Sequence, residues 1–253
     1  MLLALDTATR LISLALHDGQ AVVAESTWHS ANTHTVELAP QVALLLRRAG
    51  LDASKLRGVA VALGPGSYTG LRIGLGFAKG LALAQNLALV GVGTYEGLLR
   101  AQAPRPEPVL AVLQAGRGRV LAARFQWRAK ARRWEPLDSA RVVIWADLAA
   151  SIETATFVCG EVDPAGAEQL RARRGLVTLA SAAQSLRRAG YLAEIGWERL
   201  RAGNGTADDT SRLAPIYASG PDGAAAPADK PEPAPGPAGA TEPAAAPPAA
   251  PAS

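Results

Sequence analysis

The glycine-rich stretch at residues 64–76 constrains the fold of this chain more than any other segment. It reads GPGSYTGLRIGLG and follows an apolar run at residues 59–63 that is typical of a buried strand. The residues after it, 77–85, have the spacing of an amphipathic helix. A glycine-rich loop therefore joins a strand to the N-terminus of a helix, which is an α/β arrangement.

Two interpretations of this loop stay open. Gly64, Gly66 and Gly70 permit close backbone approach, and helix N-termini present free N–H groups, so the loop faces a phosphate in one interpretation. In the other it is a tight turn in which glycines allow close helix–strand packing. No Lys-Ser/Thr pair follows the last glycine, which excludes a Walker A loop, and the dinucleotide spacing does not fit. Ser67 and Thr69 are expected to cap the helix.

Composition excludes several classes of protein. The 253 residues suffice for one large domain or two small ones. The sequence contains no run of 18 apolar residues, so no membrane-spanning helix is expected. The first six residues contain no basic residue and already include the acidic Asp6, so no signal peptide is expected. The single cysteine, Cys159, excludes an intramolecular disulfide and fits a reducing cytoplasm. Its strand-like surroundings predict a packed thiol rather than a nucleophile.

Basic residues concentrate at residues 117–133 and 171–188. The net charge is +4, and Trp127 and Trp134 interleave with the first basic stretch. Such a pattern allows direct tRNA or DNA contact. We expect the more common alternative, a solvated charged surface.

The C-terminal segment differs in composition from the rest of the chain. Residues 221–253 contain ten prolines and thirteen alanines among 33 residues, with no Leu, Ile, Val or aromatic residue. Such a segment cannot bury enough apolar surface to offset the entropy of ordering it. We predict a disordered Pro/Ala-rich tail over residues 218–253.

The remaining chain shows the same order of elements twice. Each half reads as three strands, a helix, a strand and a helix, which predicts subdomains at residues 1–105 and 106–217 with a cleft between them. The expected strands are at residues 2–5, 11–16, 21–28, 59–63, 88–92, 109–113, 119–127, within 133–144, 156–158 and 176–179. The expected helices are at residues 35–49, 69–85, 94–102, 145–152, 164–174 and 181–201.

Four segments together resemble one known family. The opening LALDTAT, the loop GPGSYTGLRIG, the following AKGLALA and the closing APIY are similar to TsaB, also called YeaZ. The resemblance covers residues 1–217 and implies the duplicated actin/Hsp70-like (ASKHA) fold. It further implies a non-catalytic subunit that supports TsaD in synthesis of threonylcarbamoyladenosine in tRNA. There the threonylcarbamoyl group moves from its adenylate to the adenosine next to the anticodon.

The same resemblance implies partners and a location. A TsaD-like catalytic subunit and a TsaE-like ATPase are expected, with tRNA reached indirectly through the complex. A homodimer is expected when the chain is alone, in the cytoplasm and away from membranes.

Departures from active members of this fold argue against catalysis. The first turn reads Asp6-Thr7-Ala8, without the glycine of the Asp-x-Gly turn that holds phosphate and metal. His29 and His34 are five residues apart, so they do not share a helix face as a metal-binding pair four apart would. Gln114 stands where family members often carry an aspartate. We therefore expect no catalytic residue, no metal and no dedicated cofactor.

Weak or composite binding of ATP or ADP stays open. It would use two loops that resemble nucleotide-binding loops but depart from their motifs: the turn with Asp6 and Thr7, and the glycine-rich loop with Gly64, Gly66, Ser67, Thr69 and Gly70. Asp6 has two interpretations: it faces the cleft, or, as we favour, it caps its own turn through backbone N–H groups.

The first two long helices are the expected partner interface. In the first helix, Val36 belongs to one apolar stripe, and Leu38, Val42 and Leu45 form a second, outward one. Packing on the sheet needs only one apolar face and a second implies a partner, so all four residues are expected at the partner interface. In the second helix, Gly74, Ala78 and Leu81 share a stripe that permits close helix approach. Arg72 lies in the first turn, where a cation opposes the helix dipole, so a compensating anion is expected beside it. A carboxylate of this chain or of a partner is favoured over a nucleotide.

Two other functions are considered. One is a self-sufficient ATPase or kinase of the same fold, which requires nucleotide turnover by the isolated chain. The other is a chaperone or protease acting on the catalytic partner, which ranks last because no nucleophile constellation is present.

Overall fold

The computed structural model describes residues 1–31, 33–203 and 208–218 of the chain. From residue 219 onward, the predicted disordered tail lies outside the described residues. Within the described part, no helix is long and apolar enough to cross a membrane.

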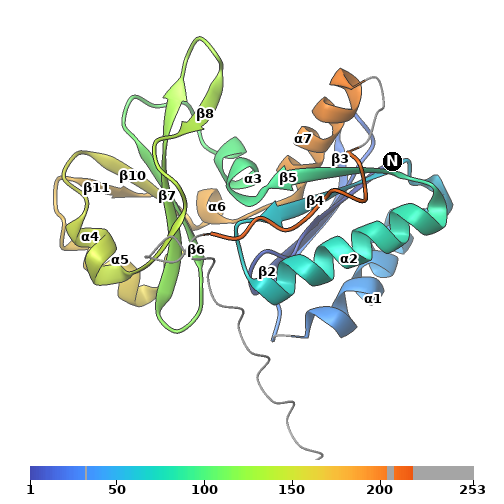
Figure 1. The fold of residues 1–253 in the computed structure, drawn as a ribbon, viewed down its shortest axis with the longest axis horizontal. Helices are drawn as coiled ribbons and strands as arrows, with labels where there is room; N and C mark the ends of the chain where they lie inside the picture. Colours follow the sequence, from blue (N-terminus) through green and yellow to red (C-terminus); the bar gives the residue numbers. More distant parts are fainter. Residues whose placement is uncertain (32, 204–207, 219–253) are drawn as a thin grey trace, which may run out of the picture.

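The first half forms a five-stranded mixed sheet. Its order is β3-β2-β1-β4-β5, with an antiparallel meander followed by two strands parallel to β1 (Figure 1). The central strands are apolar on both faces because helices cover both sides of the sheet. The strands are β1 (Leu2–Asp6), β2 (Leu11–His17), β3 (Val22–His29), β4 (Gly58–Gly64) and β5 (Ala88–Gly93).

The second half repeats this topology. Its order is β11-β10-β6-β7-β8, with β9 also paired to β7, so from the other edge a meander again precedes two parallel strands. The duplicated actin-like α/β fold is therefore confirmed. The third strand expected within residues 133–144 is two short strands, β8 and β9. The strands are β6 (Val109–Gln114), β7 (Arg119–Arg128), β8 (Arg133–Pro136), β9 (Arg141–Ile144), β10 (Thr156–Gly160) and β11 (Val177–Leu179).

The helices follow the expected order with one correction. The single helix expected at residues 181–201 is wrong, because the backbone at Leu186 and Arg188 is extended and separates α6 from α7. This break directs the side chain of Arg187 into the protein interior. The helices are α1 (His34–Arg48), a 3-10 turn (Ala53–Lys55), α2 (Tyr68–Gln85), α3 (Thr94–Arg100), α4 (Trp145–Ala150), α5 (Pro164–Arg171), α6 (Ala182–Ser185) and α7 (Ala189–Ala202).

The two halves exchange their last helices. α1 and α2 cover one face of the first sheet, and α7, from the second half, covers the other face (Figure 1). In return, α3 from the first half packs with the buried face of β6. The proposed subdomain boundary at residue 105 divides the chain by sequence, whereas each packed lobe contains a helix from the other half.

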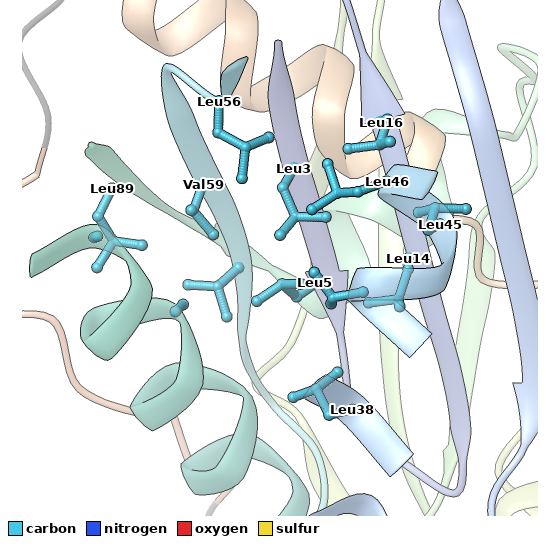
Figure 2. Packing of buried hydrophobic residues seen from close by; sticks show 14 of the residues in the cluster. Leu3, Leu5, Leu14, Leu16, Leu38, Leu45, Leu46, Leu56, Val59 and Leu89 are labelled. Atoms are coloured by element: carbon cyan, nitrogen blue, oxygen red, sulfur yellow. The ribbon is translucent and has the colours of Figure 1, made fainter. Parts of the chain in front are cut away.

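The core between the first sheet and α1 reverses the expected direction of one face of that helix. Leu38, Val42 and Leu45 are buried against the sheet, as Figure 2 shows for the two leucines. Val36, also expected at the partner interface, is 67% exposed. Both stripes are apolar, and the spacing alone does not say which one the sheet covers. The prediction that Leu38, Val42 and Leu45 form an outward face is therefore wrong.

The stripe predicted on α2 also faces inward. Gly74 and Ala78 are buried, and Leu81 is half-buried against the same core. A Cβ at Gly74 would lie 2.1 Å from Oγ1 of Thr7, so this glycine permits the close approach of α2 to the end of β1. The glycine of this stripe serves packing of the helix on its own sheet.

Two glycines in α2 give a matched test of this packing. Gly74→Ala is expected to lower the free energy of unfolding by about 1–3 kcal/mol because the new methyl overlaps Thr7. At Gly76 an added Cβ meets nothing within 4 Å, so Gly76→Ala is expected to raise stability by up to about 1 kcal/mol through helix propensity. Urea denaturation of both variants checks this, and equal effects would contradict the packing assigned to Gly74.

Candidate functional site at the junction of the two lobes

The two loops predicted to be of nucleotide type contact each other directly. Ser67 donates its backbone N–H to the carbonyl of Ala8 at 2.6 Å, and the Thr7 hydroxyl donates to the carbonyl of Gly70 at 2.8 Å. Ser67 also caps α2 by accepting from the N–H of Gly70, as expected, whereas Thr69 is exposed. Protein backbone therefore fills the space between the turn after β1 and the loop before α2.

The loop glycines are explained by these contacts. A Cβ at Gly66 would lie 2.3 Å from the carbonyl oxygen of Ala8, and one at Gly70 would lie 2.2 Å from that of Thr7. Gly64 has a φ of +120°, and a Cβ there would lie 2.1 Å from the carbonyl oxygen of Ile216. Close packing by itself requires glycine at all three positions. Nucleotide binding by these loops stays a prediction.

A buried guanidinium lies where the lobes meet. The side chain of Arg187 is 1% exposed and pairs with Asp6 at 2.5 Å and with Glu161 at 3.0 Å. Asp6 ends β1 in the first sheet, and Glu161 directly follows β10 in the second. Arg187, which lies between α6 and α7, thus bridges a strand end of one lobe and a strand end of the other.

Further hydrogen bonds complete this cluster. Arg187 also donates to the hydroxyl of Thr9 at 2.5 Å and to the carbonyl of Leu11 at 2.8 Å. Thr9 donates to Glu161 at 2.6 Å. Gln114 donates its backbone N–H to the other Glu161 oxygen at 2.9 Å, and its side-chain amide to the Glu161 carbonyl at 2.9 Å. The residue that replaces the family's aspartate therefore holds a carboxylate in place.

The electrostatics of the cluster favour a permanent ion pair. Burial disfavours the charged guanidinium, but the carboxylates of Asp6 and Glu161 outweigh it and hold the pKa of Arg187 above its ordinary value. One cation then faces two carboxylates in an interior of low dielectric, where an unpaired charge is very costly. We call Arg187, Asp6, Glu161 and Thr9 the interlobe cluster.

Asp6 takes both of its expected roles in part. Its Oδ1 accepts the N–H of Ala8 at 2.9 Å, which is the predicted turn cap, and the same atom accepts from Arg187. It does face the region between the lobes, but an arginine of the same chain meets it there. His34 is buried with Nε2 at 3.1 Å from the carbonyl of Thr9, and His29 is exposed at the end of β3. Among the described residues, no group of three metal-ligating side chains forms a site.

Arg72 contacts two tyrosines, which the sequence did not indicate. Its Nε donates to the hydroxyl of Tyr217 at 3.0 Å, and its guanidinium lies 3.8 Å from the centre of the Tyr68 ring. The two tyrosine rings stack with centroids 5.1 Å apart. Among the residues that the structure describes, Arg72 therefore has no carboxylate partner, contrary to the expectation of one within this chain. The contact instead joins the GSYTGLR loop to the APIY segment, and a partner carboxylate stays a prediction.

Sequence reasoning missed Arg187 and Glu161. Arg187 lies in a stretch with helical spacing, where an arginine is ordinarily a surface residue. A signal was nevertheless present: Asp6 ends a strand of the first repeat and Glu161 follows a strand of the second, and two carboxylates brought to one junction require a cation.

The sequence is similar to proteins of threonylcarbamoyladenosine synthesis over about half of its length. A family model described as TsaD, tRNA N6-adenosine threonylcarbamoyltransferase, matches residues 22–135. The TsaB protein of Escherichia coli K12 is 36% identical over 129 residues, covering 49% of this chain and 54% of that protein. The TsaB protein of Bacillus subtilis 168 is 32% identical over 127 residues, covering 50% and 56%. The chain spans about half the length of these curated relatives.

The structural comparison covers much more of the chain. YeaZ from Pseudomonas aeruginosa superposes with a TM-score of 0.64 at 27% identity, covering 85% of this chain and 98% of that protein. This chain is therefore similar to TsaB/YeaZ proteins in sequence over about half of its length and in fold over most of it.

The interlobe cluster makes a prediction about stability. Arg187→Gln is expected to lower the free energy of unfolding by about 3–5 kcal/mol because it leaves Asp6 and Glu161 buried without a cation. The adjacent Arg188 pairs with Glu25, but its side chain is 47% exposed, so Arg188→Gln is expected to cost less than about 1 kcal/mol. Guanidinium denaturation of both variants measures the difference. If both variants lose a similar free energy of unfolding, the buried ion pairs of Arg187 contribute no more to stability than the exposed pair of Arg188.

Proposed function

We propose that this chain is a non-catalytic scaffold subunit for threonylcarbamoyladenosine synthesis in tRNA. In this proposal it supports a TsaD-like enzyme, which transfers the threonylcarbamoyl group from threonylcarbamoyl-AMP to the adenosine next to the anticodon. A TsaE-like ATPase completes the cytoplasmic complex. The names of the TsaB relatives and the match to the TsaD family model support this assignment.

The observation that carries the proposal is the interlobe cluster. An actin-like ATPase uses the space between its lobes to hold nucleotide and metal. Here Arg187 enters that junction and pairs with the carboxylates of Asp6 and Glu161. The cluster supports a structural role for the junction and leaves the outer surfaces for function.

The outward faces of α1 and α2 support assembly. On α1 the solvent-facing residues include Val36, Ala39 and Ala43. On α2 they include Gly76, Gly80 and Leu83, of which Leu83 is 85% exposed. Two adjacent helices with small and apolar outward positions permit close approach by helices of a partner. We propose that this helix surface forms the homodimer of the isolated chain and, in exchange, binds the TsaD-like subunit.

Reconstitution tests the proposed function. The full chain is combined with TsaD-like and TsaE-like proteins from the same organism, threonylcarbamoyl-AMP and an unmodified tRNA transcript. Mass spectrometry of digested tRNA then measures the modified nucleoside. Repeated turnover is expected only when this chain is present, and the chain alone is expected to modify no tRNA. An unchanged rate without the chain would overturn the proposal.

The helix surface gives a second prediction with a matched control. Leu83→Glu is expected to weaken the homodimer and the complex with the TsaD-like subunit by about ten-fold or more, because it places a charge in an apolar contact. Leu137 in the second lobe is 45% exposed, and Leu137→Glu is expected to leave both associations unchanged. Sedimentation equilibrium measures the dimer. If Leu83→Glu leaves both affinities at the wild-type value, α2 does not contribute this surface.

A further inference from the structure

The hairpin of β7 and β8 extends beyond the sheet to which it belongs. The pairing of β7 with β6 ends at Phe125, whereas its pairing with β8 continues to the pair Arg128–Arg133. Past Phe125 the hairpin is therefore a two-stranded ribbon, and Figure 1 shows it standing away from the second lobe. Its tip is a four-residue turn at residues 129–132.

A tryptophan pair braces this ribbon. Trp127 and Trp134 are directly opposite on the two strands, with ring centroids 5.5 Å apart in an edge-to-face arrangement. Trp134 also packs against the core of the second lobe. Cross-strand aromatic pairs of this kind stabilise a hairpin. The tip is thus held at a defined position although it has no sheet neighbour on its other edge.

The tip carries a concentration of positive charge. Four of the six residues 128–133 are arginine or lysine, and all six are exposed. Glu135 pairs with both Arg128 and Arg133 at the base of the turn. Lys130 and Arg132 have no side-chain partner among the described residues. Two cations therefore project from the tip without a counter-charge in the part of the chain that the structure describes.

The backbone at Arg132 adds a second observation. Its φ is +50°, in the left-handed region where glycine or asparagine is ordinarily favoured. An arginine at this position is less favourable for folding than glycine. Folding therefore does not account for this residue, whereas an exposed charge at the tip does.

We propose that the β7–β8 tip binds the phosphate backbone of RNA through Lys130 and Arg132. Phosphates are a natural partner for unpaired cations, and a narrow charged ribbon can follow a nucleic-acid backbone without reading bases. The identity of the RNA as tRNA rests on the proposed function. The chain then contributes a direct RNA contact in addition to its contact with the catalytic partner.

The surroundings of the tip favour RNA over two other anionic partners. Anchoring in an anionic membrane requires exposed aromatic or long apolar side chains beside the cations, and the turn offers only Ala129 and Ala131. A stable contact with an acidic protein requires a broad surface with an apolar centre, which a two-stranded tip does not provide. Contacts with phosphate groups require neither apolar side chains beside the cations nor a broad apolar surface.

The opposite end of β7 supplies a matched control. The turn between β6 and β7 contains Arg117, which is exposed, has a φ of +54° and, like Arg132, has no side-chain partner among the described residues. The ten residues of β7 separate the two turns by roughly 30 Å. Arg117→Gly and Arg132→Gly thus remove the same charge from the same backbone conformation at the two ends of one strand.

The test measures binding of the full chain to an unmodified tRNA transcript by fluorescence anisotropy across a range of salt concentrations. Arg132→Gly is expected to raise Kd about three-fold and the Lys130→Gln/Arg132→Gly double variant about ten-fold, with a salt slope shallower by about 1–2. Arg117→Gly is expected to leave Kd unchanged. The melting temperature of Arg132→Gly is expected to stay level or rise.

Three results would overturn the inference. The first is a wild-type chain that binds no tRNA at low salt. The second is an equal loss of affinity in Arg117→Gly, which would indicate a general effect of net charge. The third is a tip-dependent affinity for poly-glutamate or phosphatidylserine vesicles that exceeds the affinity for tRNA.

The outcome is separable from that of the proposed function. If reconstituted tRNA modification requires the chain but the tip variants bind tRNA like the wild type, the RNA contact is wrong and the proposed function stands. If the tip variants lose tRNA affinity while modification proceeds without the chain, the RNA contact stands and the proposed function is wrong.

Discussion

The pairing of the Arg187 guanidinium with Asp6 and Glu161 is the interaction on which the arrangement of the two lobes depends. Its three charges come from the end of β1, the end of β10 and the break between α6 and α7. A charge buried in protein is tolerated only when it is paired and hydrogen-bonded. Any rearrangement that separates the lobes would leave at least one of these groups unpaired. The exchange of α3 and α7 between the halves reinforces the same junction with apolar contacts.

This constraint changes what a duplicated α/β fold can do. Enzymes with two such lobes place their reactants between them and depend on access to that space. In this chain the turn after β1 packs on the glycine-rich loop, and Arg187 pairs with the carboxylates of Asp6 and Glu161. Function is then expected on the outer surfaces. α1 and α2 offer small and apolar positions, which we propose contact a protein partner, and the β7–β8 tip offers exposed cations, which we propose contact RNA.

Much of the fold could be predicted because its signals are local. The repeated order of strands and helices follows from apolar runs and turn residues, and the glycine-rich loop marks the entry to α2. The site was less predictable because it depends on contacts between distant segments. Arg187 looks like a surface residue of a helix until the helix breaks, and α1 has two apolar stripes between which spacing cannot choose. Likewise, nothing in the local sequence around Arg72 indicates Tyr217, which is 145 positions away.

We infer that the interlobe cluster fills the junction and leaves no nucleotide site between the lobes. Calorimetric titration of the isolated full chain with ATP and Mg²⁺ tests this central claim most directly. Because Arg187 already satisfies Asp6 and Glu161, the expected result is no saturable heat of binding up to cellular nucleotide concentrations. Arg188→Gln, which leaves the cluster intact, is expected to behave in the same way. Saturable binding of ATP that Asp6→Asn abolishes, with the fold of that variant retained, would show that nucleotide enters between the lobes and would contradict the account.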